Sequence, residues 1–278
     1  MLNLKGKTAV ITGAGGVLCG AFARELAKYG VKIAVLDLNI EAAEKVAGEI
    51  NNNGGEAKAF SCNVLDKENV IKCEAEVYAH FGSYHILING AGGNNPKANT
   101  TNEYYAEADV ENPEITSFFD LSTDGFASVF SLNFMGTFIP TQVFTKRLIT
   151  QDSASVINMS SMSAPYPMTK VPAYSAAKAA IDNFTKWTAV HFAQTGLRVN
   201  AIAPGFFLTN QNHDLLIKPD GSLTPRSEKI LSNTPMGRFG EVEDLFGTLL
   251  WLCDDTMSGF ITGVTVPVDG GFLAYSGV

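Results

Sequence analysis

Short apolar runs alternate along the chain with longer stretches of helical periodicity. Seven of the runs are apolar throughout rather than at every second position, which is typical of strands in a sheet covered on both faces. They span residues 8–12, 32–37, 57–62, 85–89, 155–160, 198–203 and 263–268. Helices are expected at 17–29, 40–53, 67–81, 123–149, 172–194 and 242–254. Strands that alternate with helices predict an α/β fold with a doubly wound, parallel sheet and right-handed crossovers.

Two polar stretches, 93–117 and 206–235, interrupt this alternation. Each follows the carboxyl end of an expected strand, which is where ligands bind in open α/β sheets. Loops of this length in a compact domain are usually functional or disordered. We therefore expect both insertions, together with residues 162–171, to border a substrate pocket. Neither a repeat nor a low-complexity linker divides the chain, so one domain over residues 1–278 is expected.

Composition narrows the class of ligand. The 278 residues include 28 aspartates and glutamates against 20 lysines and arginines, and the formal net charge of −8 argues against a nucleic-acid partner. An anionic small molecule is still compatible, because one local cation can outweigh the distant field. No apolar run reaches the roughly 18 residues of a membrane span, and the run near the N-terminus is too short for a signal peptide.

The cysteines bear on metal sites and on the redox compartment. They are scattered, without a Cys-x-x-Cys pair, at positions 19, 62, 73 and 253. This spacing predicts neither a structural metal site nor a disulfide framework. A reducing, cytoplasmic setting is expected.

A glycine-rich turn, residues 12–20, joins the first expected strand to the first helix. Gly13, Gly15 and Gly16 let the backbone approach a pyrophosphate, and the helix N-terminus supplies N–H donors and positive potential. A plain glycine-rich turn is the alternative.

Asp37 closes the second expected strand, 24 residues after Gly13. An acidic residue at about this distance accepts the ribose hydroxyls of NAD, although a helix-capping or turn aspartate is the alternative. None of the three residues that follow Asp37 is cationic. A 2′-phosphate would therefore meet an uncompensated carboxylate, which favours NAD over NADP.

Tyr174 and Lys178 lie four positions apart in a strongly helical stretch and so share one helix face. A nearby ammonium favours the phenolate, and a tyrosine with a lowered pKa can exchange a proton with an alcohol or ketone. Taken alone, this pair is more commonly an ordinary surface pair. The context favours chemistry, because Ser160 and Ser161 end the preceding strand and Asn133 lies in the preceding helix.

The order of these motifs along the whole chain resembles the short-chain dehydrogenase/reductase family. The matching segments are the glycine turn from Thr12, Asp37, Asn-Gly-Ala-Gly at 89–92, Asn133, Ser161, Tyr174, Lys178, Pro-Gly at 204–205 and Val-Asp-Gly-Gly at 268–271. Ser161 is preferred to Ser160 because the family serine lies 13 residues before the tyrosine. The resemblance implies a Rossmann-like, seven-stranded parallel sheet with helices on both faces, a nicotinamide cofactor and reversible alcohol–ketone chemistry.

The resemblance also implies roles for individual residues. Tyr174 is the expected general acid and base, Lys178 lowers its pKa and binds the nicotinamide ribose, and Ser161 orients the reacting oxygen. Asn133 supports a water-linked proton path, and Thr209 helps to hold the carboxamide. The expected cofactor contacts are Gly13, Gly15, Gly16, Val17, Leu18, Asp37, Asn63, Val64, Asn89, Gly90, Ala91, Gly92, Tyr174, Lys178, Pro204, Gly205, Phe207 and Thr209.

Three departures from the family pattern involve four residues. Val17 and Cys19 occupy the last two glycine positions of the usual turn, which leaves the backbone path at the pyrophosphate open. Asn63 stands where the family has an aspartate near the adenine, and an amide still accepts and donates hydrogen bonds. Gly90 replaces the second asparagine of the fourth-strand motif. None of these departures removes a catalytic group.

The first insertion is rich in asparagine and threonine. Hydroxyls that leave water need such partners, so we expect a polyhydroxylated substrate rather than a steroid or an acyl chain. The candidate substrate contacts are Lys97, Ser163, Lys170, His213 and Arg226. Each of these cations, taken singly, is more commonly a solvated surface residue.

Four segments, 88–97, 203–212, 220–226 and 274–278, are similar to the D-mannonate oxidoreductase (fructuronate reductase) subgroup. The similarity implies that D-mannonate and NAD react reversibly to give D-fructuronate and NADH. One alternative is the same chemistry on gluconate, giving 5-ketogluconate, or on another polyol. A non-catalytic NAD-binding scaffold is less favoured, because all four catalytic candidates are present.

The last segment, 260–278, is apolar and glycine-rich and carries no charge after Asp269. Left exposed, it would form a sizeable apolar patch. Related dehydrogenases often form tetramers with twofold axes, so we expect a homotetramer or homodimer with this tail across one axis. A tail that folds back on its own subunit is the alternative.

Overall fold

The computed structural model describes residues 2–209 and 213–277, without the side chains of 213 and 214. Part of the family-like segment 203–212 (Asn210, Gln211 and Asn212), the side chain of His213, and Val278 therefore lie outside the described residues. Within those residues, no helix is long and apolar enough to cross a membrane.

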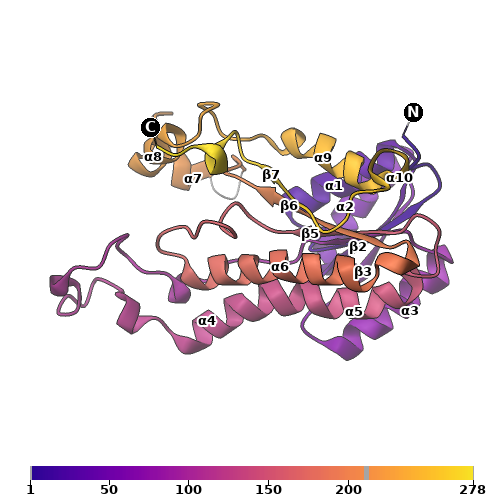
Figure 1. Cartoon of the computed structure of the whole chain (residues 1–278), viewed down its shortest axis with the longest axis horizontal. Helices are drawn as coiled ribbons and strands as arrows, with labels where there is room; N and C mark the ends of the chain where they lie inside the picture. Colours follow the sequence, from indigo (N-terminus) through magenta and orange to yellow (C-terminus); the bar gives the residue numbers. More distant parts are fainter. Residues whose placement is uncertain (1, 210–212, 278) are drawn as a thin grey trace.

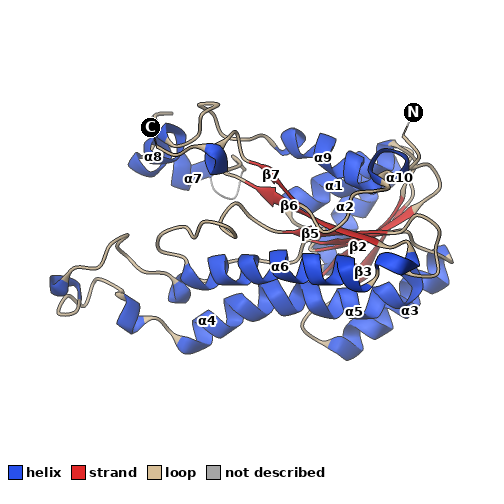
Figure 2. Cartoon of the chain, viewed as in Figure 1, coloured by secondary structure: helices blue, strands red, loops and turns tan. Residues whose placement is uncertain are grey.

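The seven expected strands form one parallel sheet (Figure 2). Its order is β3-β2-β1-β4-β5-β6-β7. The strands are β1 Thr8–Thr12, β2 Lys32–Asp37, β3 Ala57–Ser61, β4 Ile86–Asn89, β5 Ser155–Met159, β6 Arg198–Pro204 and β7 Thr265–Val268. Thr12 is level with Leu36 of β2 and with Asn89 of β4, so the carboxyl ends of the central strands meet at one edge. The order of the strands reverses between β1 and β4, and this switch point is where ligands bind in such sheets.

Helices cover both faces of the sheet (Figure 1), and the predicted doubly wound α/β fold is confirmed. On one face lie α1 Val17–Lys28, α2 Ile40–Asn52 and α9 Phe246–Cys253; on the other lie α3 Lys67–Phe81, α5 Gly136–Leu148 and α6 Pro172–His191. The strands β1 to β6 contribute to two cores, because successive side chains point to opposite faces. Ile11 and Ile88 belong to the first core, whereas Val10 and Leu87 belong to the second.

The expected helix at 123–149 is divided. It consists of α4 Thr123–Phe130, a π-helical turn Ser131–Met135 and α5. Pro140 lies inside α5, has no N–H to donate and crowds the carbonyl four residues earlier. The wider π-turn ends at that carbonyl, at Gly136, so the chain accommodates the proline without leaving the helical path.

Other differences from the predicted elements concern their ends. The strands at 57–62, 85–89 and 155–160 are one residue shorter, that at 198–203 is one residue longer, and that at 263–268 begins at Thr265. The helix at 172–194 ends at His191, and the helix at 242–254 begins as a 3-10 turn, Val242–Leu245. The earlier end of β5 at Met159 places Ser160 and Ser161, which were expected to end this strand, directly after it.

The two insertions carry structure that the hydrophobic pattern did not predict. The second contains α7 His213–Leu216 and α8 Pro225–Ser232, and a further short helix, α10 Asp255–Ser258, follows α9. The first forms an arm, residues 93–122, with 3-10 turns at Pro96–Ala98, Glu107–Asp109 and Phe118–Asp120. In Figure 1 the arm and α8 lie at the same end of the molecule as the start of α6.

Candidate active site

Helix α6 places Tyr174 and Lys178 side by side in its first two turns. Pro172 stands at the start of the helix, where its missing N–H leaves no intrahelical bond unmade. The Nζ atom of Lys178 lies 5.4 Å from the centroid of the Tyr174 ring. It donates a hydrogen bond of 2.7 Å to the carbonyl of Met159, the last residue of β5. The buried ammonium therefore joins the helix to the end of the strand.

Ser161, rather than Ser160, faces Tyr174. The hydroxyl of Ser160 donates to Asp182 on α6. Ser161 Oγ instead accepts from the N–H and the hydroxyl of Ser163, at 3.1 and 3.0 Å, and a hydrogen bond between Ser161 and Tyr174 lowers the pKa of the phenol. Ser163, a predicted substrate contact, is 1% exposed. It holds Ser161 in place here rather than lining an open surface.

Burial dominates the titration of this group. It raises the pKa of Tyr174 above its ordinary value, and the hydrogen bond from Ser161 offsets only part of that rise. Lys178 was expected to lower this pKa, but its Nζ points toward Met159 and does not outweigh the burial. Burial also lowers the pKa of Lys178 itself to about 8, against the raising effects of Cys19 and Asp182.

Asn133 lies in the π-helical turn and is fully buried. Its Nδ2 donates to the carbonyls of Gly93 and Val129 at 2.7 and 2.8 Å. Its Oδ1 has no hydrogen-bond partner among the described residues. A Cβ atom added to Gly92 would lie 2.7 Å from that oxygen and 3.6 Å from Lys178 Nζ. The amide acceptor and the ammonium thus flank the same glycine, and a buried acceptor of this kind fits a site that takes a polar ligand or water.

The glycine turn leaves room for a pyrophosphate. Gly13 has φ +65°, and a Cβ there would lie 2.9 Å from Ala91, so only glycine fits. Gly16 begins α1 without a side-chain cap, and the first turn of α1, which includes Val17 and Leu18, holds no acidic residue. The N–H groups of that turn are therefore open to an anion.

Asp37 stands beside this turn. Its Oδ2 accepts from the N–H of Gly15 and its Oδ1 from the N–H of Asn39, both at 2.9 Å. A Cβ on Gly15 would lie 3.0 Å from the same carboxylate. Glycine turn, helix end and carboxylate together fit a dinucleotide with its ribose next to Asp37.

The other expected cofactor contacts differ in what their side chains do. Asn89 was expected at the cofactor, but its Nδ2 donates to Thr141 and Asn158 at 2.9 and 2.8 Å, so this side chain holds β4, β5 and α5 together. Asn63 is exposed beyond β3, and its Oδ1 accepts from the N–H of Leu65. Val64 is buried beside Gly136.

The turn after β6 lies at the same edge of the sheet. A Cβ on Gly205 would lie 2.6 Å from the Cα of Asp269, so Gly205 lets this turn pack against the end of β7. Pro204 ends β6, and Phe207 is buried and pairs with Gly240 in a short bridge. Thr209 is the last residue described before the gap at 210–212.

The expected substrate cations lie in two places, Lys97 near the start of α4 and Lys170 and Arg226 near Glu103. Lys97 is exposed on the arm, and its backbone packs against Gly125 at the start of α4. Lys170 and Arg226 both act electrostatically on Glu103 of the arm. Lys229 of α8, which the sequence analysis did not select, forms an ion pair with Glu103. The charges of Glu103 and Lys229 were visible in the sequence, but their pairing was not.

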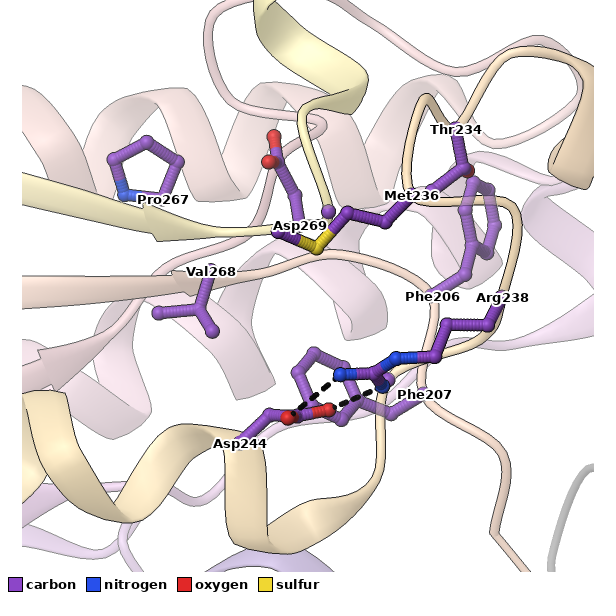
Figure 3. A pocket seen from close by; sticks show the side chains of 11 residues that line it. Phe206, Phe207, Thr234, Met236, Arg238, Asp244, Pro267, Val268 and Asp269 are labelled. Atoms are coloured by element: carbon purple, nitrogen blue, oxygen red, sulfur yellow. Dashed lines mark hydrogen bonds and ion pairs between the residues drawn. The ribbon is translucent and has the colours of Figure 1, made fainter.

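A pocket lies beside the ends of β6 and β7 (Figure 3). It is lined by Phe206, Phe207, Thr234, Met236, Arg238, Gly240, Asp244, Pro267, Val268, Asp269 and Gly270. The Arg238 guanidinium donates to the Asp244 carboxylate at 2.6 and 2.9 Å and lowers the pKa of that carboxyl to about 2. The cation is thus neutralised within the chain. Tyr174 does not line the pocket, so the pocket lies beside the reaction centre rather than around it.

Comparison with known proteins places the chain in a family. The family model described as short chain dehydrogenase matches residues 7–219. The chain belongs to the short-chain dehydrogenase/reductase family, which confirms the resemblance found in the sequence.

The chain is similar over nearly its whole length to three known proteins. An uncharacterized oxidoreductase of Bacillus subtilis, UxuB, is 60% identical over 276 residues, 99% of this chain and 98% of that protein. A Haemophilus influenzae protein, provisionally described as a D-mannonate oxidoreductase and solved with bound NAD, is 55% identical with a TM-score of 0.96, over 100% of this chain and 98% of that one. An NAD⁺-bound xylitol dehydrogenase is 29% identical with a TM-score of 0.83, over 97% and 100% of the two chains.

Proposed function

We propose that this protein is an NAD-dependent oxidoreductase that interconverts a secondary alcohol and a ketone of a sugar acid, with D-mannonate and D-fructuronate as the substrate pair. The observation that carries the proposal is the convergence of Ser161, Tyr174 and Lys178 next to an edge of the sheet that fits a dinucleotide. The description of the Haemophilus influenzae relative supports the choice of substrate.

The chain supplies position and proton transfer. The bound nicotinamide supplies or accepts the hydride. Tyr174 gives a proton to the ketone oxygen in reduction and takes it back from the alcohol in oxidation. Ser161 Oγ accepts both bonds from Ser163, so its own proton is left to the Tyr174 hydroxyl and, once substrate binds, to a reacting oxygen placed beside that hydroxyl. With NAD bound, the Lys178 ammonium would hold the ribose hydroxyls, and its positive charge would favour the phenolate against the effect of burial. Asn133 Oδ1 lies beside Gly92, as Lys178 Nζ does, and has no partner among the described residues. It can accept a hydrogen bond from a water that relays protons to Lys178.

Asp37 supports NAD rather than NADP. Its carboxylate is held by the N–H groups of Gly15 and Asn39, next to the glycine turn. A 2′-phosphate there would face a negative charge, and the three following residues Leu38, Asn39 and Ile40 provide no cation to offset it. Two ribose hydroxyls, in contrast, can donate to the carboxylate.

The arm supports a substrate with many hydroxyl groups. Its first part packs beside Tyr174, because Ala98 shares a cluster with Ala173 and the tyrosine ring. Asn95 reaches Ser128 and Asn94 reaches Asn99, so amide groups border this side of the site. Amides of this kind can replace the water that polyol hydroxyls lose on binding.

The test is NADH consumption with D-fructuronate, run beside 5-ketogluconate and D-xylulose, with Tyr174→Phe as the matched variant. Turnover of fructuronate that the phenylalanine variant loses, while its NADH affinity is retained, is the expected result. Preferred turnover of ketogluconate or xylulose would move the substrate to another sugar acid or polyol. An undiminished rate in Tyr174→Phe would refute the proton-transfer role.

A further inference from the structure

The arm connects the reaction centre to α8. Near its start, Ala98 packs against Ala173 and Tyr174. Two residues further on, the N–H of Thr100 donates to the carbonyl of Lys170 at 3.0 Å. Three residues beyond that, Glu103 pairs with Lys229 of α8. This stretch therefore runs from the tyrosine across the loop before α6 to the second insertion (Figure 1).

Glu103 sits among three cations from two separate segments. The hydrogen bond from Lys229 and the charges of Lys229, Lys170 and Arg226 hold the pKa of Glu103 below its usual range. On the other side of the pair, Glu103 raises the pKa of Lys229. One carboxylate thus pairs with Lys229 and lies within electrostatic reach of two further cations, Lys170 and Arg226.

Lys170 is held there in an unusual backbone conformation. It has φ +71°, and Ser153 is the other non-glycine residue with positive φ in the described part of the chain. Such a conformation costs free energy and persists where the surroundings require it, often at binding sites. Here the bond from Thr100 fixes the Lys170 backbone four residues before Tyr174.

We propose that Lys170, Arg226 and Lys229 form the carboxylate-binding end of the substrate site, and that Glu103 occupies it as an internal carboxylate that the substrate carboxylate displaces. This rests on the proposed sugar-acid substrate. The exchange replaces one carboxylate by another of the same chemistry, so the cations stay paired throughout. Because Glu103 competes for the same cations, it weakens substrate binding and favours anions over neutral polyols that cannot displace it.

The test is a set of charge variants assayed with D-fructuronate. Glu103→Gln removes the competitor and should lower KM by about three- to tenfold. Lys229→Gln and Arg226→Gln should each raise KM by about tenfold, and Lys229→Arg should restore most of the loss, with the effects falling on KM rather than on kcat. Lys72→Gln is the matched control, since this exposed lysine lies on α3, outside both insertions and outside the cluster.

A binding measurement separates this inference from the substrate assignment. The NADH complex of each variant is titrated with D-mannonate, D-gluconate and neutral D-mannitol, none of which carries a ketone that could accept the hydride of NADH. Tighter binding of the acids by Glu103→Gln, weaker binding by Lys229→Gln and no charge dependence for mannitol support the subsite even if fructuronate is not turned over. If the acids bind Lys229→Gln and Arg226→Gln as they bind Lys72→Gln, or if Glu103→Gln binds them more weakly, the subsite is wrong even when fructuronate is a substrate.

Discussion

Cys19 and Gly90, two departures from the family pattern, occupy one space. The family has glycine at the first position and asparagine at the second. In this chain the Sγ atom of Cys19 lies where a side chain on residue 90 would begin, since a Cβ added to Gly90 would be 2.0 Å from it. Cys19 belongs to the first turn of α1 and Gly90 follows β4, so the thiol packs the glycine turn against the neighbouring strand.

The size of the effect follows from these distances. Ordinary contacts between heavy atoms are about 3.5–4.0 Å, so Gly90→Ala requires Cys19 Sγ to move by well over 1 Å. Cys19 is 5% exposed, so its sulfur can move this far only by displacing packed neighbours. We expect Gly90→Ala to destabilise the fold by about 3 kcal/mol, the upper end of overpacking costs. Cys19→Ala removes one buried atom and should cost about 1 kcal/mol.

The double variant Cys19→Ala/Gly90→Ala should be more stable than Gly90→Ala alone. Without the sulfur, the new methyl group meets Cys19 Cβ at 3.3 Å and the Thr12 carbonyl at 2.9 Å, so the rescue is partial. We expect a coupling of about 1–2 kcal/mol in a double-mutant cycle. Urea unfolding of the four proteins, followed by circular dichroism at constant m-value, measures it. NADH titration of the same proteins should follow the same order.

A second glycine provides the control. A Cβ on Gly55 would lie 2.6 Å from the Ile50 side chain, a comparable clash in a different part of the sheet. Gly55→Ala and Cys19→Ala should therefore add within about 0.5 kcal/mol. If Cys19→Ala and Gly90→Ala are additive to the same extent, the two departures are unrelated and the packing argument is refuted.

Three other residues give measurable predictions: Lys178, Asp37 and Phe260. Burial lowers the pKa of Lys178 from 10.5 to about 8. Between these pH values Lys178 is protonated in the unfolded chain but not in the folded one. The free energy of unfolding should therefore rise with pH across this window, by up to about 3 kcal/mol. Urea titrations at both ends of this window should show the rise in the wild type and not in Lys178→Met. Asp37→Asn should weaken NADH binding by about tenfold and reduce the preference over NADPH, and an unchanged preference in fluorescence titrations would contradict its proposed position at the ribose. Phe260 is fully exposed near the edge strand β7, so Phe260→Asp should lower the mass measured by light scattering if the tail packs on a second copy; an unchanged mass would favour a tail that serves its own subunit.

The central part of the sheet was predictable because its strands have no polar face. Val10 and Leu87 enter one core while Ile11 and Ile88 enter the other, so β1 and β4 contain no solvent-facing position to interrupt the apolar run. The division of the helix at 123–149 was harder to foresee. Residues 131–135 keep the composition of a helix, and the wider turn results from how the chain accommodates Pro140 rather than from a change in hydrophobic period.

The reaction centre was predictable to the extent that local spacing determines it. Tyr174 and Lys178 are neighbours in any regular helix. Ser163, however, was expected to contact substrate because of its place in the loop. Only the structure shows that it donates two hydrogen bonds to Ser161 and so holds that side chain in place. The pair of Glu103 and Lys229 lies between two insertions, 126 residues apart. No helical or strand period relates such segments. The sequence therefore showed that both residues are charged but did not predict that they form an ion pair.

The net charge of −8 affects the binding of large and small anions differently, because a charge acts only over a short distance in salt solution. At physiological ionic strength, charges beyond about 8 Å are largely screened. A nucleic acid carries many phosphates along its length and therefore meets a wide part of an acidic surface. A sugar acid of six carbons meets only the cations at its own site, where Lys170, Arg226 and Lys229 surround Glu103. The same composition thus argues against the first ligand and not against the second, because the affinity for a small anion depends on where the cations stand and not on how many acids lie elsewhere.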